Sequence, residues 1–423
     1  MSLAKNIELL RRLPKLHEIG GFGDFARNLR PDLHSPLVET TGFGTNPGDI
    51  RMFSFVPEKL QRAPALVVVL HGCGQTAAGY DIGAGWSTLA KRYGFALLMP
   101  EQQSSNNPRC CFNWFNPEDI ARDSGEACSI RQMIARMTAD LGVDRRRIFV
   151  TGLSAGGAMT SVMLAAYPEI FAGGAIIAGL PYGVASNVRE ALNGMLQSSA
   201  RPAGELGDLV RHASNHKGPW PRVSVWHGSA DHTVNPANAD AIVKQWLDVH
   251  RLPLQPMSEA DVDGYPRQIW WNADGETVVE SYTITNMAHG TPLGIADNDE
   301  RYGAAGAFLI EAGISSSYHI ANFFGLTERI RQPREAANTL AATVPAKLAT
   351  KPTARAVSAA AAKEAAKTIP AAAFTSTQMP DLATVLWPRA TPAPRPKPLP
   401  QPRRGIDVGA VITRALTAAG LMK

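Results

Sequence analysis

The sequence predicts an α/β fold in which helices cover both faces of a doubly wound, mostly parallel sheet. Between residues 50 and 325, short continuous apolar runs alternate with longer helical patterns. Strands that are apolar throughout are typical of a sheet buried on both faces. Regular alternation of strands with helices favours parallel pairing of those strands.

Five apolar runs are the expected core strands, and helical patterns separate them. The runs are residues 65–70, 95–99, 148–150, 175–177 and 223–226. The helical patterns include residues 118–140 and 236–250, and residues 277–285 form a sixth strand-like run. The chain has 423 residues, 45% of them hydrophobic, which is enough for one large domain with an appendage.

Composition divides the chain into four segments. We expect a helical extension at 1–40, a catalytic domain at 41–327, an Ala/Pro-rich basic disordered linker at 328–405 and a short helix at 406–423. The net charge of +5 belongs to the tail, because residues 328–423 hold 15 Lys and Arg against 5 Asp and Glu. A domain without that basic excess is not expected to bind nucleic acid.

The N-terminal residues predict a cytoplasmic protein. Arg11, Arg12 and Lys15 interrupt every apolar run near the start, so the pattern of a secretory signal is absent there. No segment approaches the roughly 18 consecutive apolar residues of a transmembrane helix.

The four cysteines are Cys73, Cys110, Cys111 and Cys128. They are too few for a disulfide scaffold, and none forms the C-x-x-C pair of a structural zinc site. One disulfide remains possible, because all four cysteines lie within one third of the chain, and its pairing is left undetermined.

A nucleophile is predicted where the run 148–150 leads into the sequence GLSAG at 152–156 and then a helical pattern. A serine on a sharp strand-to-helix turn points its hydroxyl out of the sheet, and the tight turn requires glycine on both sides. We therefore expect Ser154 to be the nucleophile. The Ala155 N–H at the start of the following helix is the expected oxyanion donor.

A second oxyanion element is expected after the run 65–70, which leads directly into HGCGQ at 71–75. Many α/β-hydrolases carry such a segment after an early strand, and one of its backbone N–H groups completes the oxyanion hole. The Cys73 N–H is our candidate. His71 is interpreted as a structural support of the loop.

The acid and the base should follow the serine in that order, each after a later strand. Asp231 lies in the turn after the run 223–226, and a turn-capping role is its structural alternative. His289 lies in a Gly/Pro turn after the run 277–285. His319, within a helical pattern, is the rival base. Together Ser154, Asp231 and His289 predict an acyl-enzyme mechanism on an α/β-hydrolase fold.

The sequence resembles the polyhydroxybutyrate depolymerase family of esterases, which are related to feruloyl and acetylxylan esterases. The resemblance covers roughly residues 40–325. It rests on the motifs LHGCGQTAAGY, CFNWF, RDSGEACSIRQMI, VTGLSAGGAMT, VWHGSADHTVNPAN and MAHGTPL. It implies the same triad, no metal or organic cofactor, and hydrolysis of short-chain 3-hydroxyalkanoate esters. Extracellular family members carry a signal peptide, and this sequence shows no such pattern, so we expect polyhydroxyalkanoate granules, oligomers or other small esters inside the cell as partners. The resemblance leaves secretion open as the alternative.

Substrate contacts and alternative functions complete the expectations. Trp114 and Trp220 are candidates for lining an acyl groove, with core or rim packing as the alternative, and Gln75 for orienting the ester through its amide. A feruloyl- or acetyl-type carboxylesterase is the alternative with the same chemistry. A non-catalytic protein that binds polyester granules is the alternative of another class.

Overall fold

The computed structural model describes residues 35–327. The predicted linker at 328–405, the predicted helix at 406–423 and most of the predicted N-terminal extension lie outside the described residues. The boundary expected at residue 40 is displaced toward the N-terminus, because β1 (Val38–Thr40) already pairs with β2 (Arg51–Phe55) in the main sheet.

The sheet has ten strands in the order β1-β2-β4-β3-β5-β6-β7-β10-β9-β8. Its six central strands, from β4 to β10, run parallel, whereas the two strands at each edge pair antiparallel. The further strands are β3 (Leu66–Leu70), β4 (Ala96–Glu101), β5 (Ile148–Leu153), β6 (Gly173–Ile177), β7 (Arg222–Gly228), β8 (Ser258–Val262), β9 (Tyr265–Trp271) and β10 (Thr277–Ile284). The mostly parallel sheet predicted from the apolar runs is confirmed.

Helices cover both faces of this sheet and enclose two hydrophobic cores. Successive side chains of β3 enter opposite cores, as the period of two requires: Leu66 and Val68 enter the first, Val67 the second. The first core is covered by α5 (Pro117–Ile120), α6 (Gly125–Leu141), α7 (Ala155–Ala166), α8 (Val188–Leu196), α9 (Ala203–His212) and α10 (Ala237–His250). The second is covered by α3 (Ala77–Ala84), α4 (Trp86–Tyr93) and α11 (Ser316–Phe323).

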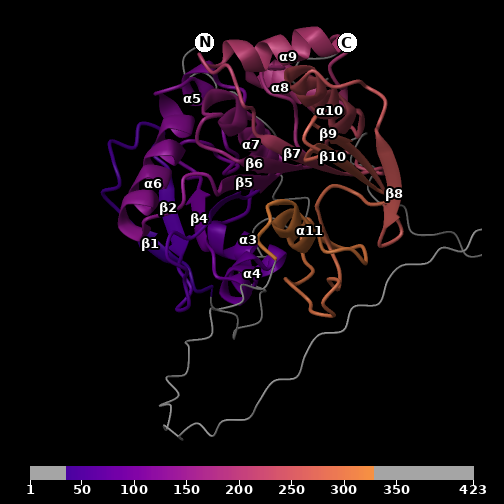
Figure 1. The fold of residues 1–423 in the computed structure, drawn as a ribbon. Coiled ribbons are helices and arrows are strands. Elements are labelled where there is room, and N and C mark those ends of the chain that lie inside the picture. Colours follow the sequence, from indigo (N-terminus) through magenta and orange to yellow (C-terminus); the bar gives the residue numbers. More distant parts are fainter. Residues whose placement is uncertain (1–34, 328–423) are drawn as a thin grey trace, which may run out of the picture. The chain divides into compact units, whose positions relative to one another are not determined.

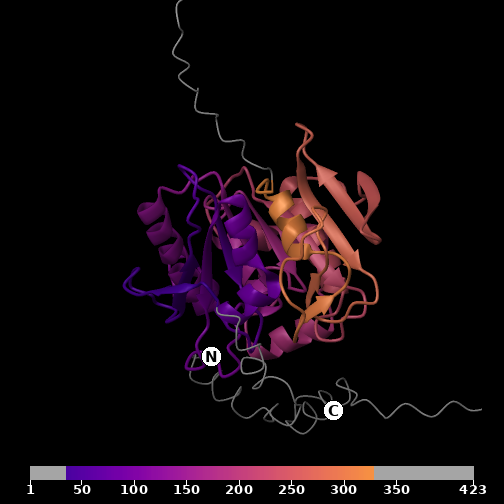
Figure 2. The same cartoon turned by 90° about the horizontal axis from the view of Figure 1, so that it is seen from below.

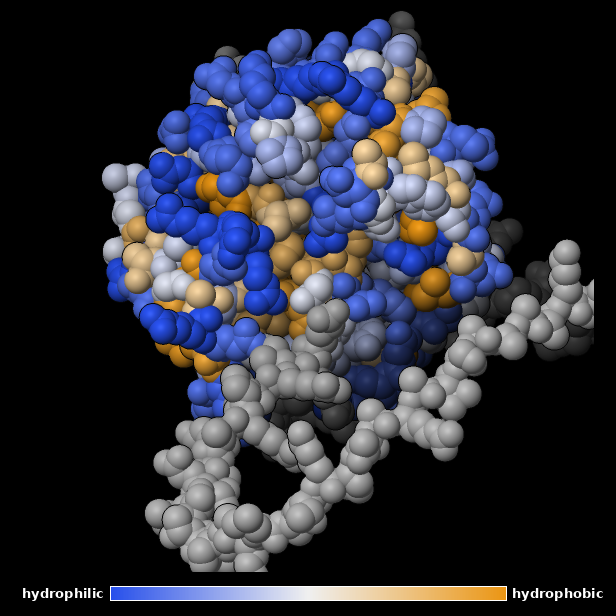
Figure 3. Space-filling view, in the orientation of Figure 1, coloured by the Kyte–Doolittle hydropathy of each residue, from blue (hydrophilic) through white to orange (hydrophobic). Residues whose placement is uncertain are grey.

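The figures show these two helical layers on either side of the sheet. In Figure 1, α8, α9 and α10 lie above the sheet, and α3, α4 and α11 lie below it. Figure 2 views the second layer directly, with α11 in orange. On the face drawn in Figure 3, hydrophilic residues predominate and hydrophobic residues gather near the centre. That distribution fits a domain whose apolar side chains are mostly buried in the two cores.

Two smaller features complete the described part. β11 (Thr291–Leu293) and β12 (Leu309–Glu311) form a separate parallel pair just after His289. Between residues 35 and 327, none of the helices combines the length and the apolar character that crossing a membrane requires.

Candidate active site

Ser154 occupies the turn between β5 and α7, in a backbone conformation that few residues adopt. Its φ is 56° and its ψ is −116°. A non-glycine residue held at such angles costs on the order of 1–3 kcal/mol and persists only where the surroundings enforce it. The neighbouring glycines show why the turn is so tight. A Cβ added at Gly152 would lie 2.4 Å from Gly156 O, and one added at Gly156 would lie 2.3 Å from Leu70 O.

The HGCGQ loop lies beside this turn, because the start of α7 packs against the end of β3. Most of its N–H groups already have acceptors: Gly72 N donates to Gln75 Oε1 (2.8 Å), Gly74 N to Arg109 O (2.7 Å) and Gln75 N to Gly72 O (3.2 Å). Across residues 35–327, the Cys73 N–H donates to no acceptor. Ala155 is the first residue of α7, so its N–H lacks an acceptor within the helix. Both expected oxyanion donors are thus available.

His71 contacts the backbone through both of its ring nitrogens and so supports the HGCGQ loop. Its Nδ1 lies 2.8 Å from Gly72 O and its Nε2 lies 3.1 Å from Gln102 N. Because a carbonyl accepts and an amide N–H donates, Nδ1 carries the proton and Nε2 accepts. Burial lowers the pKa of His71 to about 4, so the imidazole is neutral at neutral pH. This geometry agrees with the structural role expected for His71.

The structure decides the cysteine pairing that the sequence left open. Cys73 and Cys111 form a disulfide across a sequence separation of 38, while Cys110 and Cys128 are free. The bond ties the residue that carries the expected oxyanion N–H to the segment before α5. Cross-linking of this kind restricts the loop independently of its hydrogen bonds.

Asp231 follows β7 and accepts hydrogen bonds at both carboxylate oxygens. Its Oδ1 accepts from Thr233 N (2.8 Å) and Val234 N (2.9 Å). Its Oδ2 lies 2.7 Å from His289 Nδ1 and 3.2 Å from His227 Nε2. Burial acts to raise the pKa of Asp231, but the hydrogen bonds from His227 and His289 and the charge of His289 outweigh burial and hold that pKa well below its usual value.

His289 lies in the loop after β10 and is mostly buried. Ser154, Asp231 and His289 follow β5, β7 and β10, which all run parallel, so the three residues lie at the carboxyl edge of the sheet. The loop before His289 crosses the end of β7, where a Cβ on Gly228 would lie 2.2 Å from Met287 O. The chain order of these three residues, and their position at the carboxyl ends of the strands, therefore agree with the sequence prediction.

Two residues near the site escaped sequence reasoning. His227, four residues before Asp231, contacts the same carboxylate oxygen as His289. Phe308 lies edge-on to the His289 ring, with ring centroids 5.9 Å apart. The spacing H-x-x-x-D at 227–231 is the signal that points to His227. No local pattern identifies Phe308, because the pairing of β11 with β12 brings it next to His289.

The three expected substrate contacts have different outcomes. Gln75 uses its side-chain carbonyl to hold Gly72 N, so it shapes the oxyanion loop. Trp114 is only 7% exposed and packs edge-on against Phe115 in the first core. Trp220 precedes β7 and lies at the amino edge of the sheet, opposite Ser154. This placement corrects the expectation that Trp220 lines a groove beside the nucleophile.

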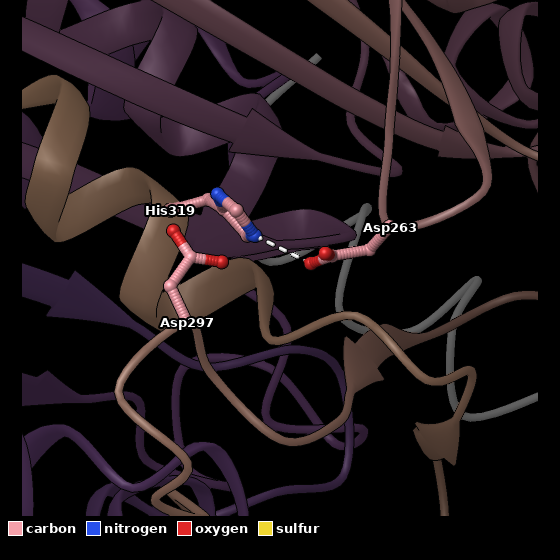
Figure 4. Close-up of side chains that lie close together, drawn as sticks. All are labelled: Asp263, Asp297 and His319. Atoms are coloured by element: carbon pink, nitrogen blue, oxygen red, sulfur yellow. Dashed lines mark hydrogen bonds and ion pairs between the residues drawn. The ribbon is translucent and has the colours of Figure 1, made fainter.

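His319, the rival base, belongs to a different cluster. Its Nε2 lies 2.9 Å from Asp263 Oδ2, and Figure 4 shows Asp297 directed toward the same imidazole. Within residues 35–327, these three are the group whose ligand atoms lie close enough together, within 4.8 Å, to hold a metal ion. Both carboxylates are solvent-exposed, and the contact between His319 and Asp263 joins α11 to the β8–β9 turn.

Comparison with known proteins identifies the family. Residues 53–253 match the family described as esterase PHB depolymerase. The chain is 45% identical over 291 residues to poly(3-hydroxyalkanoate) depolymerase C of Paucimonas lemoignei, covering 69% of this chain and 70% of that protein. The chain belongs to the PHB depolymerase esterase family. It is a serine esterase of the carboxylic ester hydrolase class.

Further relatives of this PHB depolymerase-family esterase are named for other esters. An acetylxylan esterase of Coprinopsis cinerea is 34% identical, covering 60% of this chain and 69% of that protein. Feruloyl esterase B of Neurospora crassa is also 34% identical, covering 62% of this chain and 90% of that protein. Among solved structures, the acetyl xylan esterase from Aspergillus awamori matches with a TM-score of 0.58 at 24% identity, covering 69% of this chain and 99% of that one. This last likeness supports the α/β-hydrolase fold.

Proposed function

We propose that this esterase hydrolyses esters of short-chain 3-hydroxyalkanoic acids, as polyhydroxybutyrate or its oligomers, through an acyl-enzyme. The observation that carries the proposal is the 2.7 Å contact between His289 Nδ1 and Asp231 Oδ2 at the same sheet edge as the Ser154 turn. The substrate class is supported by the 45% identity to a protein named as a poly(3-hydroxyalkanoate) depolymerase.

In the proposed mechanism, His289 removes the proton of Ser154 as Oγ attacks the ester carbonyl. Asp231 accepts the hydrogen bond of His289 Nδ1, which leaves Nε2 free to act as the base. The buried carboxylate stays ionised because its pKa is depressed, so it stabilises the imidazolium that forms. His289 then returns the proton to the departing alkoxide, and water releases the acyl group by the reverse sequence.

The negative charge of the tetrahedral intermediate is assigned to the N–H groups of Cys73 and Ala155. Both donors are fixed before substrate arrives: the disulfide and the Gln75 side chain hold the loop, and the first turn of α7 holds Ala155. Donors already oriented toward the developing charge need no reorganisation during the reaction. Removing one such donor typically costs about 10²–10³ in kcat.

Phe308 is the side chain we assign to the substrate groove. It is partly exposed, and its ring lies edge-on to that of His289. An aromatic edge offers apolar surface that favours the short aliphatic chain of a hydroxyalkanoate.

The experiment that tests the function compares ester turnover across four substrates, each with the wild type and with Ser154→Ala. The substrates are a 3-hydroxybutyrate trimer, amorphous polyhydroxybutyrate granules, p-nitrophenyl butyrate and methyl ferulate. The highest kcat/KM on the trimer or granules, lost in the variant, supports the proposal. Preference for the ferulate overturns the substrate assignment and favours the chemistry named for the feruloyl esterase relatives.

A fluorophosphonate probe separates the esterase from a non-catalytic granule-binding protein. Only a serine activated by a neighbouring base reacts with such a probe at an appreciable rate. Labelling of the wild type and its loss in Ser154→Ala and His289→Ala supports the mechanism. A wild type that binds granules but takes up no label contradicts it.

Granule association and cellular location are further parts of the proposal. We propose that the basic segment 328–423 contributes to association with granules; co-sedimentation of the full chain and of a chain ending at residue 327 tests this. We propose a cytoplasmic location; the alternative is an oxidising compartment, of which a disulfide is typical. Fractionation of the native cells, with thiol alkylation of each fraction, distinguishes the two locations.

A further inference from the structure

A basic cavity of about 930 Å³ lies at the amino edge of the sheet. It is bounded by the segments that enter β5, β7 and β10, by the ends of α9 and α10, and by Phe324 after α11. Arg147 precedes β5 and Ser154 follows it, and a strand of six residues spans about 20 Å. The cavity is therefore separate from the candidate active site, which lies at the carboxyl edge.

Cationic side chains are concentrated around this cavity. Residues 35–327 hold 21 Lys and Arg against 28 Asp and Glu, so the described part is acidic. Among its lining residues, the cavity nevertheless has six cations and one carboxylate, Glu276. The cations are Arg146, Arg147, Arg211, Lys217, Arg222 and Arg251. Like charges gathered in this way repel one another unless anions neutralise them.

Protein carboxylates neutralise only half of these cations. Arg146 pairs with Asp144, Arg211 with Asp208 and Asp248, and Arg222 with Glu276. The side chains of Arg147, Lys217 and Arg251 make no ion pair or hydrogen bond with any residue between 35 and 327. Arg147 also feels the charge of Asp144 without pairing to it, and Lys217 and Arg251 are exposed, so all three cations can meet an external anion.

The rest of the lining is apolar and aromatic. Phe149, Phe171 and Val278 line it alongside Trp220, whose ring is held edge-on by His216 at a centroid distance of 5.0 Å. A volume of this size accommodates a ligand of cofactor size. Guanidinium groups bind phosphate and carboxylate in a planar, bidentate manner, and an aromatic ring offers a flat apolar surface.

We propose that this cavity binds a phosphorylated anion that carries several negative charges and has an apolar or aromatic portion. Phosphate supplies the two or more charges that three unpaired cations require within a small volume. The apolar portion of the ligand lies on the Phe and Trp surface, and its phosphates meet Arg147 and Lys217. This role for Trp220 replaces the contact beside Ser154 that the sequence suggested.

Binding is tested by titration calorimetry in 150 mM salt with three probes: ATP, inorganic tripolyphosphate and citrate. ATP and tripolyphosphate are expected to bind with a submillimolar Kd, and ATP at one hundred times its Kd to raise Tm by about 5 °C. Tighter binding of ATP than of tripolyphosphate assigns part of the affinity to the aromatic surface. Citrate binding as tightly as either, or no binding of the two phosphates, overturns the proposal.

Two double variants locate the site. Arg147→Gln with Lys217→Gln removes two unpaired cations of the cavity and is expected to weaken ATP by about 100-fold. Arg189→Gln with Lys244→Gln makes the same charge change at exposed positions outside the cavity and is expected to leave the Kd unchanged. An equal loss in both variants contradicts a defined site. Unchanged hydrolysis of p-nitrophenyl butyrate shows that each variant is folded, because Ser154 lies at the opposite edge.

Discussion

Replacing His227 tests how the buried carboxylate of Asp231 is held. The His227 Nε2 lies 3.2 Å from Asp231 Oδ2 and 2.9 Å from Val234 O. Both of these atoms are acceptors, so Nε2 must carry the proton, and the buried Nδ1 has no partner among residues 35–327. His227 therefore serves as a second donor to Asp231, beside His289.

The expected size of the effect comes from that one hydrogen bond. A hydrogen bond to a charged group contributes about 1.5–3 kcal/mol. The bond to Asp231 is long and shares its proton with Val234 O, so we take about 1.5 kcal/mol. A free-energy difference of this size corresponds to about a tenfold change in rate. His227→Phe keeps a ring but removes the donor, and is expected to lower kcat about tenfold. His227→Gln places an amide N–H near the position of Nε2 and is expected to recover most of the rate.

Stability against pH provides the second measurement. The pKa of Asp231 is lowered in the folded state, so its ionised form stabilises the fold above the unfolded pKa of about 4. That stability is lost as the pH falls toward the folded pKa. His227→Phe raises the folded pKa, so the variant should lose less free energy of unfolding than the wild type as the pH falls below about 4. This difference is the readout, because removing the unpartnered Nδ1 also changes the absolute stability.

The comparison of the two variants decides whether the lower kcat results from loss of the hydrogen-bond donor or from loss of the imidazole ring. Wild-type kcat and wild-type acid sensitivity in His227→Phe would refute the assigned role. A His227→Gln variant as slow as His227→Phe would assign the effect to packing of the ring.

Three further outcomes are expected. Ser154→Ala should lower kcat for p-nitrophenyl butyrate by at least about 10⁴-fold with Tm unchanged, and residual turnover above that level would exclude it as the nucleophile. Cys111→Ala opens the disulfide to Cys73 and should lower the free energy of unfolding in guanidinium by about 4 kcal/mol, while Cys110→Ala, which touches no disulfide, should lower it much less. Phe308→Ala should raise KM for butyrate esters about three- to tenfold with a smaller change in kcat, because it removes apolar surface beside the site; an unchanged KM would place it outside the groove.

The features predicted correctly from sequence are those that local chemistry determines. The apolar runs at 65–70, 148–150 and 223–226 correspond to β3, β5 and β7, because only a strand buried on both faces needs such a run. The turn at Ser154 was predictable because its conformation demands glycine at two fixed positions. Asp231 and His289 followed from chain order, since each ends a parallel strand.

The sequence did not predict the edge strands, because they lack the apolar runs that reveal the central ones. β8 and β9 are largely exposed or half-buried, so their sequences lack the apolar run of the central strands. β1 has three residues with little burial, and its pairing with β2 moved the domain boundary. Antiparallel strands at a solvated edge leave only a weak hydrophobic pattern.

The sequence by itself determined the fold class, the strand–turn–helix around Ser154 and the positions of Asp231 and His289 after later strands, since each depends on a local pattern. Only the tertiary structure decided the partner of Cys73, the contact of His227 with Asp231, and the contact of Phe308 with His289. These depend on which strands are neighbours and on which end of each strand a loop emerges. The order of the strands in the sheet and the paths of the loops bring particular side chains together, and no local pattern carries that information.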